Sequence, residues 1–253
     1  MDSDAFLSHL VADGERLAVA AGGNLDAQVP SCPGWTVRDL VAHAGRVFGQ
    51  KAATVRSGEL SVPETGWPAP EAPEGPEPVL LAWYRGQLGD VVEVLRSTAP
   101  DRPAWSWYPQ AATVGFWCRR MAQEAVIHRV DAELARGRPG PVDPDLALDG
   151  IDEVLAVFLV PRSLDGDPPP GGRGGRVVVR SGGRAWLVTL GADRISLSEG
   201  LPEAGAEAAD ATVSGPADQV LLWLWGRAPD AAVDLAGEGE AVEALRRQVA
   251  RAT

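Results

Sequence analysis

The spacing of apolar residues changes once along this 253-residue chain, and this change limits the possible folds more than any other feature. Up to Pro161, apolar side chains recur at helical spacing. After the stretch DGDPPPGGRGG they occur in short alternating runs separated by glycines, a pattern typical of antiparallel strands. The sequence therefore predicts an α+β protein with a helical domain (1–162), a Pro/Gly linker (163–175) and a small α+β domain (176–253).

The helical domain is expected to be an up-and-down four-helix bundle followed by a fifth helix. Ser3 or Asp4 is a candidate cap for the first helix, and Thr36 with Asp39 forms a candidate capping box for the second. The Pro-rich segment VPETGWPAPEAPEGPEP cannot be helical and is expected to form a long surface loop. The five helical apolar stripes span 6–19, 40–48, 79–95, 113–136 and 146–158.

Composition restricts the kind of partner and the compartment. A net charge of −12 argues against a nucleic-acid partner, because binding to phosphates needs a basic surface. Two cysteines are too few for a disulfide framework, the N-terminus lacks a signal-peptide pattern, and no apolar run is long enough to cross a bilayer. We therefore expect a cytoplasmic monomer or homodimer that acts on small molecules, without a membrane partner.

The few histidines suggest a metal site. His128 follows Glu124 by four residues, so the two share a helix face, and His43 lies in another predicted helix. One carboxylate and two imidazoles would leave a divalent metal with an open position for chemistry. The alternatives are a hydrogen-bonded core histidine and a surface ion pair. His9 has no partner at ligand spacing and is expected on a helix surface.

Two segments, CPGWTVRDLVAHAG and RRMAQEAVIHRVDAE, resemble the mycothiol-dependent maleylpyruvate isomerase family, which belongs to the DinB-like metal-binding four-helix bundles. The run DQVLLWLWGR resembles the small sterol-carrier-like C-terminal domain of that family. The resemblance implies that His43, Glu124 and His128 are the metal ligands. Zinc is the expected ion, since it suits two imidazoles and one carboxylate.

The resemblance also implies a mechanism. Mycothiol at the open metal position would lose its proton, and the thiolate would add to the cis double bond of maleylpyruvate. Rotation and elimination would then give the trans isomer, whereas other relatives use the same thiol for S-transfer. Two alternatives stay open at this point: a noncatalytic small-ligand-binding protein with a structural or absent metal, and a metal enzyme that activates water.

Several residues near these motifs have two interpretations each. The family implicates an arginine of its C-terminal domain in catalysis, and Arg227 is the best match, although a helix C-cap would also explain it. Arg119 or Arg120 could face the cleft or the solvent. Asp131 could accept the remaining ring N–H of His128 or could be a solvent-facing acid.

Aromatic residues and cysteines complete the set of candidates. Trp105, Trp107 and Tyr108 precede the fourth helix and could line a pocket mouth or simply pack. Cys32 and Cys118 could each supply a fourth metal ligand, but buried thiols are usually inert and the family pattern does not require one.

Overall fold

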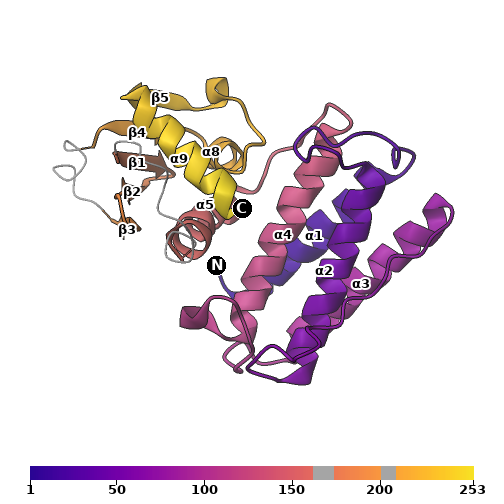
Figure 1. Ribbon diagram of the computed structural model, residues 1–253. Helices are drawn as coiled ribbons and strands as arrows, with labels where there is room; N and C mark the ends of the chain where they lie inside the picture. The colour runs from indigo at the N-terminus through magenta and orange to yellow at the C-terminus, as the bar shows by residue number, and fades with distance from the viewer. Residues whose placement is uncertain (162–173, 201–208) are drawn as a thin grey trace. The chain divides into compact units, whose positions relative to one another are not determined.

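The computed structural model describes residues 1–161, 174–200 and 209–253, and these residues form two compact units (Figure 1). The first unit is Met1–Gly140 and the second is Pro141–Thr253, and each is described by itself. The two-domain α+β class predicted from the sequence is confirmed. Within the described residues, no helix has both the length and the hydropathy that are needed to cross a membrane.

The first unit contains the four helices of the predicted bundle. They are α1 (Ser3–Ala21), α2 (Val37–Ser57), α3 (Glu77–Ser97) and α4 (Val114–Leu134), with a short 3₁₀ turn at Pro109–Ala111 before α4. The capping box of α2 is present, because Thr36 accepts from the Asp39 amide and Asp39 accepts from the Thr36 amide. The cap of α1 is Asp2, which accepts from the Ala5 amide, rather than Ser3 or Asp4.

The helix directions follow an up-down-down-up order rather than simple alternation. Between α2 and α3, Gly45 lies against Trp83 and Arg56 pairs with Asp90, so the two helices run the same way. Helices α1 and α4 are likewise parallel: Cys118 contacts Ser3 near their starts, and Arg16 pairs with Glu133 near their ends. Helix α4 therefore packs parallel to α1 and antiparallel to α2.

The Pro-rich loop between α2 and α3 explains this order. A 21-residue helix is about 31 Å long, and an extended chain covers about 3.3 Å per residue. Residues 58–76 are therefore enough to return the chain to the other end of the bundle, where α3 starts. Close packing of the two parallel helices depends on Gly45, because a Cβ there would lie 2.3 Å from the Trp83 ring.

The second unit combines a five-stranded sheet with helices. Its elements are α5 (Pro144–Asp152), a π-helical segment (Glu153–Leu159), β1 (Arg176–Ser181), β2 (Arg184–Leu190), β3 (Ile195–Glu199), β4 (Ala211–Ser214), α8 (Ala217–Leu224), a 3₁₀ turn (Asp230–Ala232), β5 (Asp234–Gly237) and α9 (Gly239–Ala252). The strand order is β3-β2-β1-β4-β5.

The predicted antiparallel meander is β1-β2-β3, and the remaining strands make the sheet mixed. Gly182 and Gly183, both with positive φ, form the two-residue turn between β1 and β2. Strand β4 then pairs parallel to β1 on its other edge, and β5 pairs antiparallel to β4. Because β1 lies in the middle of the sheet, Val177, Val178 and Val179 of this strand are fully buried, and α9 packs against β1 and β4.

The boundary between the units falls earlier in the chain than the sequence predicts. The fifth helix, assigned to the bundle (1–162) from its apolar stripe, is α5, and it packs against α8 in the second unit. Helical periodicity shows that a helix has an apolar face but not which element covers it. Most of the predicted linker, 163–175, lies outside the described residues.

Candidate metal centre

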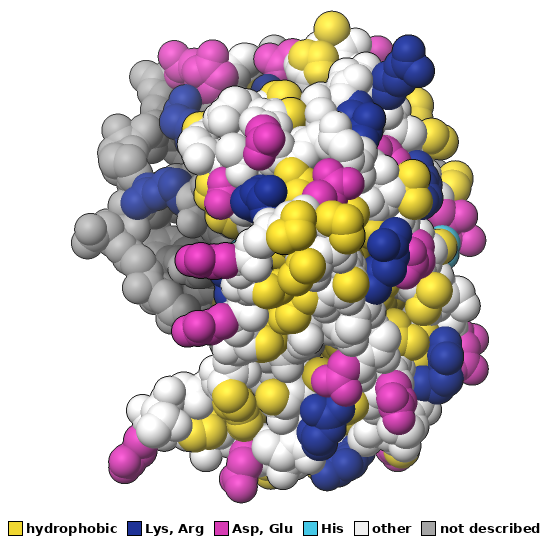
Figure 2. Space-filling view, turned by 90° about the vertical axis from the view of Figure 1, so that its right-hand side faces the viewer, with side chains coloured by type: hydrophobic (Ala, Val, Ile, Leu, Met, Phe, Trp, Pro, Cys, Tyr) yellow, Lys and Arg dark blue, Asp and Glu magenta, His cyan; other side chains and the backbone are white. Residues whose placement is uncertain are grey.

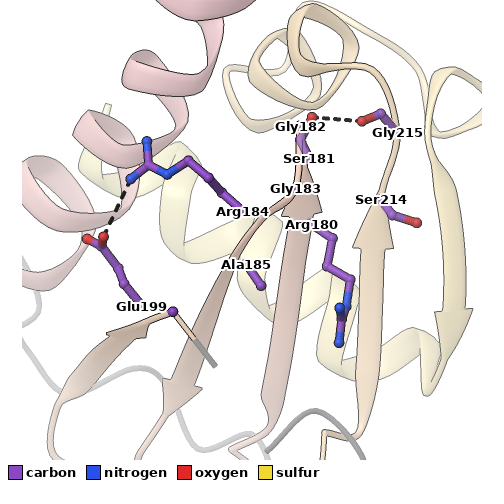
Figure 3. A pocket seen from close by; sticks show the side chains of 10 residues that line it. Arg180, Ser181, Gly182, Gly183, Arg184, Ala185, Glu199, Ser214 and Gly215 are labelled. Carbon is purple, nitrogen blue, oxygen red and sulfur yellow. Dashed lines mark hydrogen bonds and ion pairs between the residues drawn. The ribbon is translucent and has the colours of Figure 1, made fainter. Parts of the chain in front are cut away.

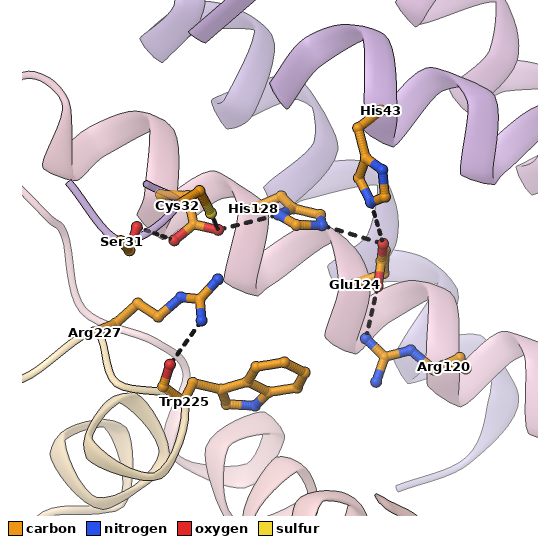
Figure 4. A network of polar contacts seen from close by, with 9 residues as sticks. Ser31, Cys32, His43, Arg120, Glu124, His128, Trp225 and Arg227 are labelled. Carbon is orange, nitrogen blue, oxygen red and sulfur yellow. Dashed lines mark hydrogen bonds and ion pairs between the residues drawn. The ribbon is translucent and has the colours of Figure 1, made fainter. Parts of the chain in front are cut away.

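Three side chains from two antiparallel helices converge between α2 and α4 (Figure 4). His43 extends from α2, while Glu124 and His128, one turn apart, extend from α4. Glu124 Oε1 lies 3.1 Å from His128 Nε2 and 3.5 Å from His43 Nε2. One donor atom from each residue lies within 4.8 Å of the other two, so the three donors surround a common point.

This donor set has the chemistry and the spacing of a zinc site. Bonds of about 2.0–2.1 Å at tetrahedral angles put neighbouring ligand atoms about 3.3 Å apart. The separations of 3.1 and 3.5 Å around the Glu124 oxygen bracket this value. Two imidazoles and one carboxylate occupy three of the four tetrahedral positions, so this arrangement fits a metal that retains an open position.

Asp131 orients His128 from the opposite side of the ring. The His128 Nδ1 lies 3.1 Å from Asp131 Oδ2, and Asp131 itself is fully buried. The loop before α2 holds this carboxylate: the Ser31 hydroxyl donates to Oδ1 at 2.5 Å, and the Cys32 thiol donates to Oδ2 at 3.7 Å. An Nδ1–H donated to Asp131 leaves the Nε2 lone pair directed at the common point.

The electrostatics of this cluster favour a positive charge. Burial lowers the pKa of His128, but the carboxylates of Glu124 and Asp131 outweigh burial and raise it to about 9. Burial raises the pKa of Glu124, and His128, His43 and Arg120 outweigh it, so that pKa lies well below its usual value. Glu124 is therefore ionised, and a bound cation would replace the proton on His128.

Arg120 is the arginine that joins the cluster. It is almost fully buried, and its guanidinium donates to Glu124 Oε2 at 3.0 Å, which leaves Oε1 directed at the two imidazoles (Figure 4). Arg119 is half-buried. The ring of Trp35 meets His43 edge-on with centroids 5.0 Å apart, and this contact restricts the orientation of the second imidazole.

Comparison with known protein families shows which family this chain belongs to. The profile of the mycothiol maleylpyruvate isomerase N-terminal domain matches residues 7–133, and that of the MDMPI C-terminal domain matches residues 145–244. The chain belongs to the mycothiol-dependent maleylpyruvate isomerase family of enzymes.

Solved structures show the same fold. A crystal structure of the mycothiol-dependent maleylpyruvate isomerase is similar over 94% of this chain and 95% of that chain, with a TM-score of 0.60 and 13% identity. The crystal structure of a histidine-to-alanine mutant of that enzyme matches equally well. A comparison with curated proteins gave no match.

The structure answers several questions that the sequence left open about this family member. Asp131 is the buried acceptor for His128 and not a solvent-facing acid. His9 lies outside the three-residue cluster, as do both cysteines, so neither thiol stands where a fourth ligand would. Ser31 also contributes to the site through its hydrogen bond to Asp131, and it was not among the predicted residues. The only signal was its place next to the CPGW turn, whose fold brings it to α4.

Arg227 belongs to the second unit, where it follows α8. Its guanidinium donates to the Trp225 carbonyl at 2.6 Å and lies 5.6 Å from the centre of the Trp225 ring (Figure 4). The contact with a carbonyl at the end of α8 agrees with the helix-cap interpretation. The catalytic role that the family resemblance implies for Arg227 stays a prediction.

A second concave region, in the second unit, lacks comparable chemistry (Figure 3). It has a volume of about 800 Å³ and lies at the β1–β2 turn. Its Arg184 pairs with Glu199 at 3.4 Å, so these charges neutralise one another. On the face shown in Figure 2, acidic and basic side chains are interspersed among hydrophobic ones, with no continuous basic patch among the described residues of that face.

Proposed function

We propose that this chain is a zinc enzyme that activates mycothiol for addition to an electrophilic small molecule, as in the cis–trans isomerisation of maleylpyruvate. The observation that carries the proposal is the convergence of His43, Glu124 and His128 on one point. Family membership supports it independently, because the family is named for this reaction. A cytoplasmic location accompanies the proposal, since both cysteines are free thiols.

Zinc would be held by His43, Glu124 and His128. When bound, it would supply one kind of chemistry, which is stabilisation of a thiolate over a thiol at neutral pH. The surrounding residues prepare the ligands for that role. Asp131 holds the Nδ1–H of His128, and Arg120 occupies the second oxygen of Glu124, so each ligand presents one lone pair.

The isomerisation itself needs no net gain or loss of atoms. The thiolate sulfur forms a C–S bond to one carbon of the conjugated double bond, and the π electrons move toward the neighbouring carbonyl oxygen. The former double bond is now single and rotates. The electrons then return, the C–S bond breaks, the trans double bond forms and the thiolate is regenerated. In S-transfer, the C–S bond would instead persist in the product.

The charge of the substrate suggests a role for Arg227. A dicarboxylate such as maleylpyruvate is best held by charge-assisted hydrogen bonds, and a guanidinium provides two parallel donors for one carboxylate. We therefore propose Arg227 as a residue that contacts the substrate. Under this proposal, Arg227→Lys would keep more activity than Arg227→Met, whereas both variants would keep the metal.

Metal analysis and thiol titration test the proposal. We expect about one zinc per chain in the purified protein, and mycothiol binding that is lost in His43→Ala together with the metal. His9→Ala is the matched control, because this histidine lies outside the cluster and should keep both properties. The proposal is wrong if the wild type holds no stoichiometric metal, or if mycothiol binds equally well without His43.

Assays of hydrolysis and of apolar-ligand binding on the same samples separate the alternatives. A protein that holds zinc, binds no thiol and hydrolyses its substrate would be a metal enzyme that activates water. A protein that binds a small apolar ligand equally well with and without the metal would be a noncatalytic carrier.

A further inference from the structure

Lys51, the only lysine of the chain, lies on α2 where this helix packs against α4, as does the candidate metal centre. We call the contact between α2 and α4 the α2 seam and the contact between α1 and α4 the α1 seam. Lys51 follows His43 on α2 by eight residues, which is about 12 Å along the helix axis. Its Nζ lies 5.0 Å from the ring centre of Trp117 on α4 and 5.9 Å from that of Trp107 in the preceding loop. The ammonium is therefore held between two helices by aromatic faces.

The ammonium is partly desolvated but lacks a carboxylate counter-ion. Its hydrogen bond goes to the neutral Gln50 Oε1 at 2.7 Å, and no carboxylate in the described part of the chain comes within the 4.0 Å of an ion pair. Burial lowers the pKa of Lys51, while the charge of Glu124 raises it and that of Arg120 lowers it. Lys51 is thus near enough to the centre to interact electrostatically with Glu124 without pairing with it.

Packing alone does not account for this arrangement. An ammonium over an aromatic ring is attracted by the negative face of the ring, and part of that gain offsets the loss of water. A partly buried charge without a counter-ion is costly in a structural role but useful where an anionic ligand supplies the opposite charge. An ammonium has three donor hydrogens, and the Gln50 amide oxygen uses one of them.

The loop before α4 builds an aromatic wall beside this charge. The Trp105 ring stacks with Trp117 at 6.3 Å between centroids, and the Trp117 indole donates to the Trp105 carbonyl at 2.7 Å. The Trp107 ring, which is 41% exposed, meets Trp117 edge-on at 5.2 Å. Because Trp117 is fully buried, the ring available to a ligand is the exposed Trp107 ring, where a flat, conjugated carbon chain would lie with its carboxylate against the ammonium.

We propose that Lys51 is a specificity-determining residue that binds a carboxylate of the electrophile. The substrate class is then an unsaturated carboxylic acid whose carboxylate binds Lys51 while its double bond lies toward His43, Glu124 and His128. This inference rests on the proposed function, because it takes the metal centre as the place of reaction. It adds a cationic contact within the bundle, in the same unit as the three ligands.

Calorimetric titration with maleate and with dimethyl maleate tests this role, because the two differ in charge but share the cis double bond. We expect the zinc-loaded wild type to bind maleate at least tenfold more tightly than the diester. In Lys51→Met this preference should fall by about tenfold, with diester binding unchanged. Lys51→Arg keeps the charge and should retain most of the preference. Arg56→Met is the control, since Arg56 lies on α2 but pairs with Asp90 on α3.

Three results would overturn the assignment: no preference for maleate in the wild type, an equal preference in Lys51→Met, or equal weakening of both ligands in that variant. The second result would mean that maleate binds the metal alone, and the third that Lys51 only maintains packing. Metal content and mycothiol binding are measured on the same samples. If the wild type holds no zinc or binds no mycothiol, the proposed function fails, whereas an equal maleate preference in the zinc-holding wild type and in Lys51→Met overturns only the Lys51 assignment.

Discussion

Helix α4 carries buried charged networks on two sides, and they differ in how their charges are satisfied. Toward α1, Arg129 donates to Asp13 at 3.0 Å and to Glu133 at 2.7 Å, and Arg16 also pairs with Glu133. Toward α2, the lone pairs of two imidazoles and one carboxylate meet at one point. Between α1 and α4 the acids pair with arginines, whereas between α2 and α4 three donor atoms lie close enough together to fit a cation.

The comparison shows how burial of charge distinguishes structure from function. Between α1 and α4, Asp13 and Glu133 each have a guanidinium beside them, so these ion pairs hold the two helices together. In the α2 seam, the arginine and Asp131 orient the donors from behind and leave their lone pairs directed at one another.

The largest effect is expected from Arg129→Met. This change leaves Asp13 and Glu133 without their buried partner, and loss of one partner of a buried pair costs about 3–5 kcal/mol of unfolding free energy. Urea denaturation of wild type and variant measures the loss. Arg85→Met is the control, because Arg85 pairs with Glu15 on the surface and should cost less than about 1 kcal/mol. A similarly small loss of unfolding free energy in both variants would show that the ion pairs of Arg129 do not hold α1 and α4 together.

A pH dependence is expected for the α2 seam after the metal is removed with a chelator. The pKa of His128 is raised to about 9 from an ordinary value of 6.5. Protonated His128 therefore contributes stability that is fully present below pH 6.5 and is lost as the pH rises through 9. The contribution is at most about 3 kcal/mol. Urea midpoints between pH 6.5 and 9.5 measure it, and a slope that persists in His128→Gln would refute its assignment to this residue.

A smaller effect is expected from Asp131→Asn. The carboxylate raises the basicity of His128 and fixes its orientation, so its loss should weaken zinc affinity about 10–100-fold. Competition with a zinc chelator measures this affinity. Ser31→Ala is the matched variant, because Ser31 contacts Asp131 and should change the affinity by only a few-fold. Equal effects of the two changes would mean that Asp131 does not act through His128.

The smallest effect concerns the two thiols. Cys118 is fully buried, contacts Ser3 of α1, and has a pKa raised to about 11 by burial. Cys32 is half-buried beside the metal centre. At pH 8, iodoacetamide should therefore label Cys32 alone in the native protein, as peptide mass spectrometry would show. Labelling of Cys118 at a similar rate would mean that the α1 seam opens as readily as the α2 seam.

Much of the fold followed from local patterns. The Thr36 and Asp39 capping box, the stripes of the four bundle helices and the alternating runs of the meander each depend on residues close in sequence. The errors were of another kind. Helix α5 was placed with the bundle, and helix directions were expected to alternate, because neither periodicity nor caps specify which helices pack together.

The candidate site also has a part that local spacing predicts and a part that depends on helix packing. Local spacing alone places Glu124 and His128 on one face of one helix, because residues four apart on a helix are neighbours. The packing of whole helices, which local spacing does not specify, sets α2 antiparallel beside α4 and so brings His43 to the pair and Lys51 to Trp117. It also decided that Asp131 is buried behind His128 rather than exposed. These contacts join positions far apart in the chain, and packing of whole helices, not local propensity, determines them.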